Sequence, residues 1–140
     1  MNAENMKDFA IPYTAAWCSQ DAAAVAVFYA ENGSLKINDR DASVGREAIT
    51  QAAQGFMTAF PDMAARMDDL RVTGGQAVYH WTLTGTNTGP GGTGKAVRIS
   101  GLEEWAIDED GLIIESLGHL DEEGYHRQLQ YGAGSIRLRA

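Results

Sequence analysis

The two halves of the chain have different hydrophobic periodicities, and this feature constrains the fold most strongly. Between residues 45 and 60, apolar side chains recur at the i, i+3, i+4, i+7 and i+11 positions that form one face of a helix. Those positions are Ile49, Ala52, Ala53, Phe56 and Phe60. Residues 77–86 and 95–107 are instead rich in β-branched and aromatic residues, which favours strands. The chain is therefore predicted to place helices first and a sheet second.

A helix is also predicted near the start of the chain. Asp8 is a suitable N-cap residue. Phe9, Tyr13 and Trp17 follow at spacings near four residues, so they share one face. Pro12 then falls within the first turn, where its missing N–H costs little because the first N–H groups of a helix have no helical partner. We expect the aromatic face of this helix to lie against the core.

A second, short helix is predicted after Asp21. It would bury Phe28 and Tyr29 and end at residues 32–33, an Asn-Gly pair typical of helix ends. Together with the helix at 45–60, this makes three helices in the first half of the chain.

Five strands are predicted, most of them in the second half. They cover residues 34–38, 63–72, 77–86, 95–107 and 112–120. Polar or glycine-containing turns separate them. A short closing helix is predicted over 121–131, with a loose tail after it. The result is one α+β domain over residues 1–140, with three N-terminal helices packed on one face of a curved, mainly antiparallel sheet.

The charge balance limits the partners of such a domain. The 140 residues contain 19 acidic and 11 basic side chains, for a net charge of −8. An acidic surface repels the phosphates of nucleic acids and the head groups of anionic membranes. Neither a nucleic acid nor a membrane is therefore expected as a partner, and the simplest consequence of the charge is solubility.

Three further features indicate a cytoplasmic protein. Cys18 is the only cysteine, which excludes an internal disulfide and fits a reducing compartment. Residues 1–8 lack the basic start and apolar run of a signal peptide. The sequence also contains no stretch of about 18 apolar residues that would span a membrane.

The segment Gly89–Lys95 resembles a phosphate-binding loop, but the surrounding sequence argues against that function. It matches G-x-x-x-x-G-K, yet Ala96 stands where such a loop needs Ser or Thr to hold magnesium. A phosphate-binding loop also opens a helix, whereas the residues that follow here predict a strand. The glycines are better explained as the turn of a β-hairpin.

The strand at 95–107 carries a candidate functional carboxyl group. One side of this strand consists of Val97, Ile99, Gly101, Glu103 and Trp105. Because four of these five are apolar or glycine, the side is expected to face inward and to bury Glu103. Burial raises the pKa of a carboxyl group, and a neutral acid can donate a hydrogen bond to a ligand oxygen. Two alternatives remain open: Glu103 pairs with a buried donor, or Glu104 is the inward residue and Glu103 is exposed.

Other candidates for chemistry have structural explanations of equal weight. Tyr13 lies on the apolar face of its helix, where a phenol commonly serves as core. His119 and Asp121 follow the last strand and could act together in acid–base chemistry. Asp121 is also a suitable N-cap for the closing helix, and the two roles do not exclude each other.

Metal and hydrolase chemistry have little support. The three histidines have no ligand spacing such as H-E-x-x-H. The G-x-S-x-G turn of a serine hydrolase is absent as well. No metal is therefore expected. The tryptophans, Trp17, Trp81 and Trp105, could stack on an aromatic ligand, although core packing is the default role for each.

Several short motifs recur in a familiar order. They are Tyr13-x-x-x-Trp17, Gly45-Arg46-Glu47-Ala48-Ile49, His80-Trp81-Thr82, Gly101-x-Glu103-x-Trp105, Asp110-Gly111-Leu112-Ile113 and Asp121-x-x-x-Tyr125-x-x-Gln128-Leu129. In this order and spacing, the chain resembles the nuclear transport factor 2-like superfamily, which includes the ketosteroid isomerases, and within it the SnoaL-like polyketide cyclases. The resemblance implies a cone-shaped fold and suggests a homodimer.

The resemblance also implies roles for particular residues. Asp121 matches the acid–base catalyst of the cyclases, which close a ring by intramolecular aldol condensation without a cofactor or metal. Tyr13 and Glu103 fall on the two positions that hold the enolate oxygen in ketosteroid isomerases, with Glu in place of Asp. At the position of the isomerase base, an ungapped alignment places Ile37, and only a shifted alignment makes Asp39 the base.

The resulting hypothesis is a cofactor-free cyclase or isomerase for a small apolar ketone. Asp121, assisted by His119, would move a proton while Tyr13 and Glu103 hold the carbonyl oxygen. The residues expected to enclose the ligand are Trp17, Phe28, Phe56, Phe60 and Trp105. Two alternatives share the fold: a non-catalytic module that binds a small ligand, and a dimeric association domain.

Overall fold

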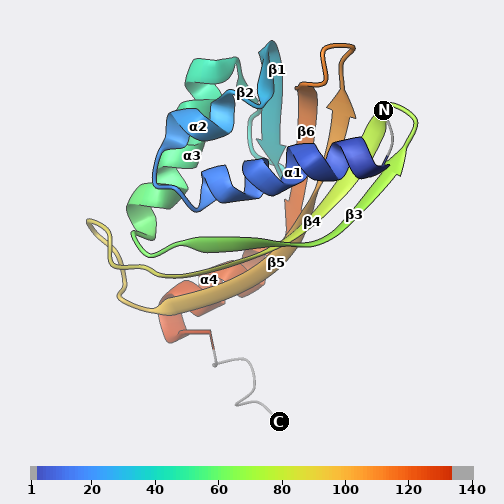
Figure 1. Ribbon diagram of the computed structural model, residues 1–140. Helices are drawn as coiled ribbons and strands as arrows, with labels where there is room; N and C mark the ends of the chain where they lie inside the picture. Colours follow the sequence, from blue (N-terminus) through green and yellow to red (C-terminus); the bar gives the residue numbers. More distant parts are fainter. Residues whose placement is uncertain (1–2, 134–140) are drawn as a thin grey trace.

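The computed structural model describes residues 3–133 of the chain (Figure 1). The elements are α1 (Ala3–Trp17), α2 (Ala22–Ala26), β1 (Tyr29–Ile37), β2 (Ser43–Val44), α3 (Arg46–Ala59), β3 (Ala64–Thr73), β4 (Gln76–Thr86), β5 (Ala96–Ile107), β6 (Ile113–Leu120) and α4 (Glu122–Tyr131). Most of the loose tail expected after α4 lies outside the described residues. None of the described helices is both long enough and apolar enough to cross a membrane.

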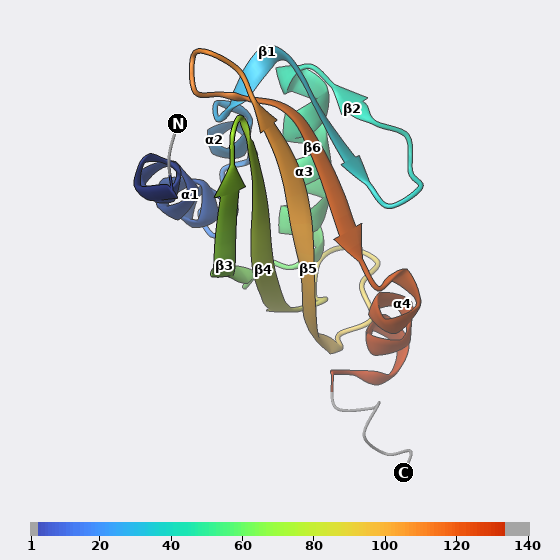
Figure 2. The same cartoon turned by 90° about the vertical axis from the view of Figure 1, so that its right-hand side faces the viewer.

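The six strands form one curved sheet in the order β2-β1-β6-β5-β4-β3. Neighbouring strands are antiparallel except for the parallel pair β1 and β6. Helices α1, α2 and α3 lie on one face of the sheet, whereas α4 lies apart from them, beside β5 (Figures 1 and 2). The α+β class, with three N-terminal helices on a mainly antiparallel sheet, is confirmed.

The core lies between these three helices and the sheet. Ile49, Ala53 and Met57 of α3 are buried, as the helical spacing predicts. The sheet contributes aromatic residues, and Trp105 of β5 and Tyr79 of β4 stack with their ring centroids 4.7 Å apart. Burial of these large apolar side chains holds the helices against the sheet.

Helix α1 begins earlier than predicted, and the expected position of Pro12 is therefore wrong. The helix starts at Ala3, so Pro12 lies in its interior and not in the first turn. The physical reason is the apolar face, which extends back to Met6. Met6, Ala10 and Tyr13 are all buried against the core. This burial compensates for the hydrogen bond that proline cannot donate.

Helix α2 is shorter than predicted, because Tyr29 pairs with β6 and does not continue the helix. Tyr29 lies opposite Ile113, and Ile113 N–H donates to the carbonyl oxygen of Phe28 at 3.0 Å. The Asn-Gly pair at 32–33, expected as a helix end, lies inside β1 at an irregularity between Tyr29 and Ser34. Glycine is required there because a Cβ atom on Gly33 would lie 2.7 Å from the carbonyl oxygen of Ile113.

The segment Gly89–Lys95 is the loop of the β4–β5 hairpin, as predicted. Residue 96 begins a strand and not a helix. Asn87 organises the loop through its side chain, which donates to the carbonyl oxygen of Ala59 at 3.0 Å and accepts from Thr93 N–H at 2.8 Å. The loop therefore presents no helix N-terminus to a phosphate.

Candidate functional site

An apolar cavity lies between the helices and the inner face of the sheet. Trp17 and Phe56 contribute helical walls, and Ile99, Trp81 and Leu120 contribute sheet walls. The enclosed volume is about 60 Å³, which corresponds to about four to six water-sized groups at roughly 10–15 Å³ each. Glu103 is the only carboxyl group among the described residues that line it.

Pairing between strands places Glu103 on this inner face. It lies opposite Tyr79 on β4 and opposite Gly118 on β6. Glu103 is 8% exposed. Glu104 points to the other side of the sheet, where its Oε2 atom lies 2.6 Å from His119 Nε2 and both side chains are 52% exposed. Of the two glutamates considered from the sequence, Glu103 is thus the inward one.

Three hydrogen bonds reach Glu103, and all end on the same oxygen atom. Oε1 accepts from the Tyr13 hydroxyl at 2.9 Å, from Trp105 Nε1–H at 2.7 Å and from the Ser116 hydroxyl at 3.1 Å. Among the described residues, none donates to Oε2. This arrangement suits a neutral carboxylic acid in which Oε1 is the carbonyl oxygen and Oε2 carries the proton. Glu103 therefore both pairs with buried donors and keeps one oxygen free.

Burial decides the protonation of Glu103. Loss of water raises the pKa of its carboxyl group, while the hydrogen bonds from Trp105, Tyr13 and Ser116 act in the opposite direction. The desolvation is the larger effect, so the pKa lies above its ordinary value. The acid form is thereby favoured over a wider range of pH than in an exposed glutamate.

Tyr13 reaches Glu103 but does not line the cavity. Its side chain is completely buried, and its hydroxyl also lies 2.9 Å from the hydroxyl of Tyr29. Burial first, and then the nearby Glu103, hold the pKa values of Tyr13 and Tyr29 well above their usual range. Both phenols therefore stay protonated, which keeps Tyr13 a donor to Glu103.

Two of the five aromatic residues expected around a ligand line the cavity. These are Trp17 and Phe56, whose ring centroids are 6.3 Å apart. Phe28 and Trp105 lie behind the cavity wall and pack edge-on against the ring of Tyr13. Phe60 is buried, with its ring centroid 6.4 Å from that of Tyr125. None of these three residues lines the cavity.

Two aromatic residues of β4 also line the cavity. Tyr79 was not among the expected ligand contacts, and Trp81 was considered only as a residue that could stack on an aromatic ligand. The available signal was the alternation along β4. It places both residues on one face, but the register against β5 is needed to show that this face is the same as that of Glu103.

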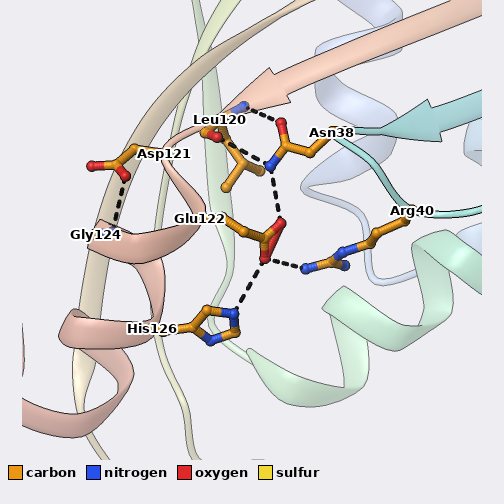
Figure 3. Close-up of polar contacts among 7 residues, drawn as sticks. All are labelled: Asn38, Arg40, Leu120, Asp121, Glu122, Gly124 and His126. Atoms are coloured by element: carbon orange, nitrogen blue, oxygen red, sulfur yellow. Dashed lines mark hydrogen bonds and ion pairs between the residues drawn. The ribbon is translucent and has the colours of Figure 1, made fainter.

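His119 borders the cavity and Asp121 follows it closely, but the polar ends of both side chains are bound elsewhere. The backbone alternation of β6 puts Gly118 and Leu120 on the cavity side, and His119 pairs with Glu104 on the opposite face. Asp121 is exposed, and its Oδ1 atom accepts from Gly124 N–H at 3.0 Å (Figure 3). Asp121 thus caps α4, one of the two roles considered from the sequence.

A polar network joins the ends of β1 and β6 beside the cavity (Figure 3). The Asn38 side chain accepts from Leu120 N–H at 3.0 Å and donates to the Leu120 carbonyl oxygen at 3.1 Å. It also donates to Glu122 Oε1 at 2.9 Å, and Arg40 pairs with Glu122 Oε2 at 2.6 Å. Because Ile37 and Leu120 line the cavity, this network holds part of its wall in place.

No converging group of three or more His, Cys, Asp or Glu side chains occurs within residues 3–133. The chemistry that the cavity itself offers is hydrogen-bond donation in apolar surroundings.

Comparison with solved structures places the fold among known ones. TsrD from Streptomyces laurentii superposes with a TM-score of 0.79 at 20% identity, over 92% of this chain and 97% of that one. A protein of ketosteroid isomerase-like fold from Catenulispora acidiphila, solved with trimethylamine, superposes with a TM-score of 0.76 at 12% identity, over 86% and 90%. SalBIII is described as an epoxide hydrolase/cyclase-like enzyme of salinomycin pyran-ring formation. It superposes with a TM-score of 0.75 at 17% identity, over 88% of this chain and 96% of that one.

These likenesses confirm the ketosteroid isomerase-like, cone-shaped fold that the sequence motifs implied. No curated protein matches the chain significantly. A profile of the SnoaL-like polyketide cyclases matches residues 7–129, which is most of the chain. The chain therefore belongs to the SnoaL-like polyketide cyclase family.

Proposed function

We propose that the protein is a cofactor-free cyclase or isomerase that stabilises an enolate of a small apolar ketone. The observation that carries this proposal is the arrangement at Glu103, where three donors occupy Oε1 and leave Oε2 to the cavity, while burial raises the pKa of the carboxyl group and favours its acid form. A carbonyl oxygen placed there accepts this hydrogen bond. The bond strengthens as the oxygen gains charge, which lowers the barrier to enolate formation.

The apolar walls increase the effect of this single donor. Electrostatic interactions are stronger where water is excluded, and fixed donors need no reorganisation during the reaction. Tyr13, Trp105 and Ser116 act as positioning residues because they hold the carboxyl group without lining the cavity.

The proton leaves the carbon next to the carbonyl group and goes to a base. We assign this step to Asp121 because of its match to the cyclase catalyst, with His119, which borders the cavity, as its assistant. To reach the substrate, the Asp121 carboxylate has to leave the Gly124 N–H that it caps. In a ring closure, the enolate carbon attacks a second carbonyl carbon, and the new alkoxide takes up a proton. In an isomerisation, the proton returns to a different carbon of the same system. Neither reaction needs an oxidant or a metal.

The cavity volume limits the size of the reacting part. About 60 Å³ accommodates one small ring or a short chain, so the rest of a larger substrate would extend through the cavity mouth. Membership of the cyclase family and the likeness to SalBIII support cyclisation over simple binding.

A non-catalytic ligand-binding module is the second candidate function. It is favoured by the orientation of two side chains: the Asp121 carboxylate caps α4, and the His119 imidazole pairs with Glu104, although His119 borders the cavity. In that case a ketone would bind at Glu103 without losing a proton.

Exchange of the α-protons of cyclohexanone with deuterated solvent, followed by NMR, tests the proposal. The wild type should accelerate exchange. Glu103→Gln should bind the ketone within about tenfold of wild type, because the amide retains both an acceptor and a donor. Its exchange rate should fall by at least about tenfold, since an amide is a poorer donor to a developing charge.

Glu115→Gln is the control, because it makes the same change at an exposed glutamate of the neighbouring strand β6. It should leave exchange unchanged. Equal losses in the two variants would contradict the role of Glu103. Binding of the ketone without any exchange above the buffer rate would favour the ligand-binding module.

A further inference from the structure

Asn38, the residue after β1, contacts the residues on both sides of Asp121 (Figure 3). Its side-chain oxygen accepts from Leu120 N–H at 3.0 Å, and its side-chain nitrogen donates to the Leu120 carbonyl oxygen at 3.1 Å. The same nitrogen donates to Glu122 Oε1 at 2.9 Å. Asn38 N–H donates to the carbonyl oxygen of Gly118 at 2.8 Å. One residue therefore ties down the end of β6 and the start of α4, with Asp121 between them.

The backbone conformation of Asn38 shows why an amide side chain is needed there. Its φ of +49° lies in the left-handed region, which asparagine tolerates better than most residues. The side chain pairs with both the N–H and the C=O of Leu120, as a neighbouring strand would. An amide has a donor and an acceptor for this purpose, whereas an ionised carboxylate of the same shape only accepts.

A second set of contacts keeps Glu122 in place as the partner of Asn38. Arg40 Nη2 lies 2.6 Å from Glu122 Oε2, and His126 Nε2 lies 3.3 Å from the same atom. The hydrogen bonds from Asn38 and Arg40 lower the pKa of Glu122, so its carboxylate stays ionised and remains an acceptor. The network thus joins the end of β1 to the first turn of α4 without using the Asp121 carboxylate.

The Asp121 carboxylate is held less firmly than the chain around it. Among the described residues, only Gly124 N–H donates to this carboxylate, at 3.0 Å, and Asp121 is exposed. Rotation of the side chain is enough to break a single N-cap bond of this kind. Leu120, the preceding residue, lines the cavity. The position of the main chain therefore decides where a rotated carboxylate arrives.

We propose that Asn38 is a positioning residue for Asp121. By holding Leu120 and Glu122, it fixes the main chain of Asp121 beside the cavity while the carboxylate leaves Gly124 and accepts the substrate proton. A movable main chain would spread the carboxylate over many positions, few of them aligned with the C–H bond that breaks. This inference rests on the proposed function, in which Asp121 is the base.

Asn38→Asp tests this role because it keeps the shape of the side chain and suits a left-handed backbone. It loses the bonds to the Leu120 carbonyl oxygen and to Glu122, and it adds a charge beside Glu122. In the cyclohexanone assay, kcat should fall at least about tenfold and KM should change less than about threefold, because Glu103 is untouched. Asn32→Asp is the matched control, since it makes the same change at an exposed residue of β1. It should leave both constants within about twofold of wild type.

Amide hydrogen exchange, followed by NMR, gives a readout that needs no turnover. Gly124 N–H donates to the Asp121 side chain, and Tyr125 N–H donates to the Asp121 carbonyl oxygen at 2.9 Å. Both amides should exchange about 3- to 10-fold faster in Asn38→Asp, whereas the amides of α3 should keep their wild-type rates. Arg40→Gln changes a side chain that is 47% exposed, so folding should tolerate it. It should show the same pattern with a smaller loss of kcat, about two- to fivefold.

The outcomes distinguish this inference from the proposed function. If Asp121→Asn abolishes α-proton exchange while Asn38→Asp keeps kcat within about twofold, the positioning role is overturned and the proposed function stands. A change confined to KM also overturns it, because Asn38 would then only support the cavity wall. If the wild type exchanges no α-protons, the proposed function fails. Faster amide exchange at Gly124 and Tyr125 in Asn38→Asp would then still support the hold of Asn38 on this chain segment, and unchanged amide exchange would overturn it.

Discussion

The hydroxyl of Tyr13 on α1 donates a hydrogen bond of 2.9 Å to Oε1 of Glu103 on β5, 90 residues further along the chain. Both side chains are buried, and the bond joins the helical layer to the sheet. It also directs the Glu103 carboxyl group, because Oε1 is engaged and Oε2 is left for the cavity.

Tyr13→Phe should affect stability and activity through this bond. The change removes one donor to Glu103 and leaves the Tyr29 hydroxyl without its partner. We expect the free energy of unfolding to fall by about 1–2 kcal/mol, measured by urea denaturation. Because the donor favours the ionised acid, its loss should raise the pKa of Glu103 further. In the exchange assay, kcat should fall more than KM rises.

Tyr131→Phe provides the comparison for this prediction, since Tyr131 is 61% exposed at the end of α4. Its free energy of unfolding should stay within about 0.5 kcal/mol of wild type. A loss of the same size in both variants would show that the buried hydroxyl contributes nothing specific.

Glu103 should give the protein a stability that declines as pH rises. Its pKa is raised in the folded state, so the folded protein holds a proton that the unfolded chain releases above the ordinary carboxyl value of about 4.5. This contribution is complete below that pH and is lost as pH rises toward the pKa of the folded state. Glu103→Gln should remove this slope, which urea denaturation at a series of pH values measures.

Other carboxyl groups work in the opposite direction and at lower pH. Hydrogen bonds to Asp62, Asp68 and Glu122 lower their pKa values, so their contributions disappear as the solution is acidified below about pH 4. These three contributions are the same in the wild type and in Glu103→Gln, so they cancel when the free energies of unfolding of the two proteins are subtracted. A difference that does not change between pH 4 and pH 9 would contradict the raised pKa of Glu103.

Substitutions at Asp121 should separate helix capping from catalysis. Asn is as good an N-cap as Asp, so Asp121→Asn should keep the free energy of unfolding within about 0.5 kcal/mol, whereas Asp121→Ala should lower it by about 1 kcal/mol. If Asp121 is the base, both variants should lose α-proton exchange. Full exchange activity in Asp121→Asn would show that Asp121 only caps α4.

Two glycines near Glu103 should respond differently to alanine. A Cβ atom on Gly101 would lie 2.4 Å from the His119 carbonyl oxygen and 2.6 Å from Trp81, so Gly101→Ala should lower the free energy of unfolding by about 1–3 kcal/mol. A Cβ atom on Gly118 would meet its nearest neighbour at 3.4 Å. Because Gly118 lines the cavity, Gly118→Ala should change stability little and weaken ketone binding. The opposite ranking by thermal unfolding would contradict this packing.

Much of the architecture follows from local patterns. The helix predicted over residues 45–60 is α3, and the strong strands predicted at 77–86 and 95–107 are β4 and β5. Each of these segments buries one face, so the spacing of its apolar residues indicates directly whether it is a helix or a strand. The inward direction of Glu103 followed from the same rule, because its neighbours on that side of β5 are apolar.

The errors occur where a distant strand changes a local preference. Residues 29–33 have helical signals, but pairing of Tyr29 with Ile113 makes them part of β1. Asp8 suggested a helix start, but burial of Met6 goes with a helix that begins at Ala3. In both cases the free energy of long-range packing exceeds the local preference, which depends on neighbours in sequence alone.

By itself, the sequence determined the fold class, the order of the elements and the burial of one acid on β5, because each of these follows from hydrophobic periodicity within a single segment. Tertiary structure decided which donors meet on Glu103 Oε1, that the His119 imidazole pairs with Glu104, and that the Asp121 carboxylate caps α4. The physical reason is that these properties depend on the register of β5 against its neighbours and on the placement of α1 across the sheet. Contacts of that kind join residues up to 90 positions apart, and no local pattern encodes them.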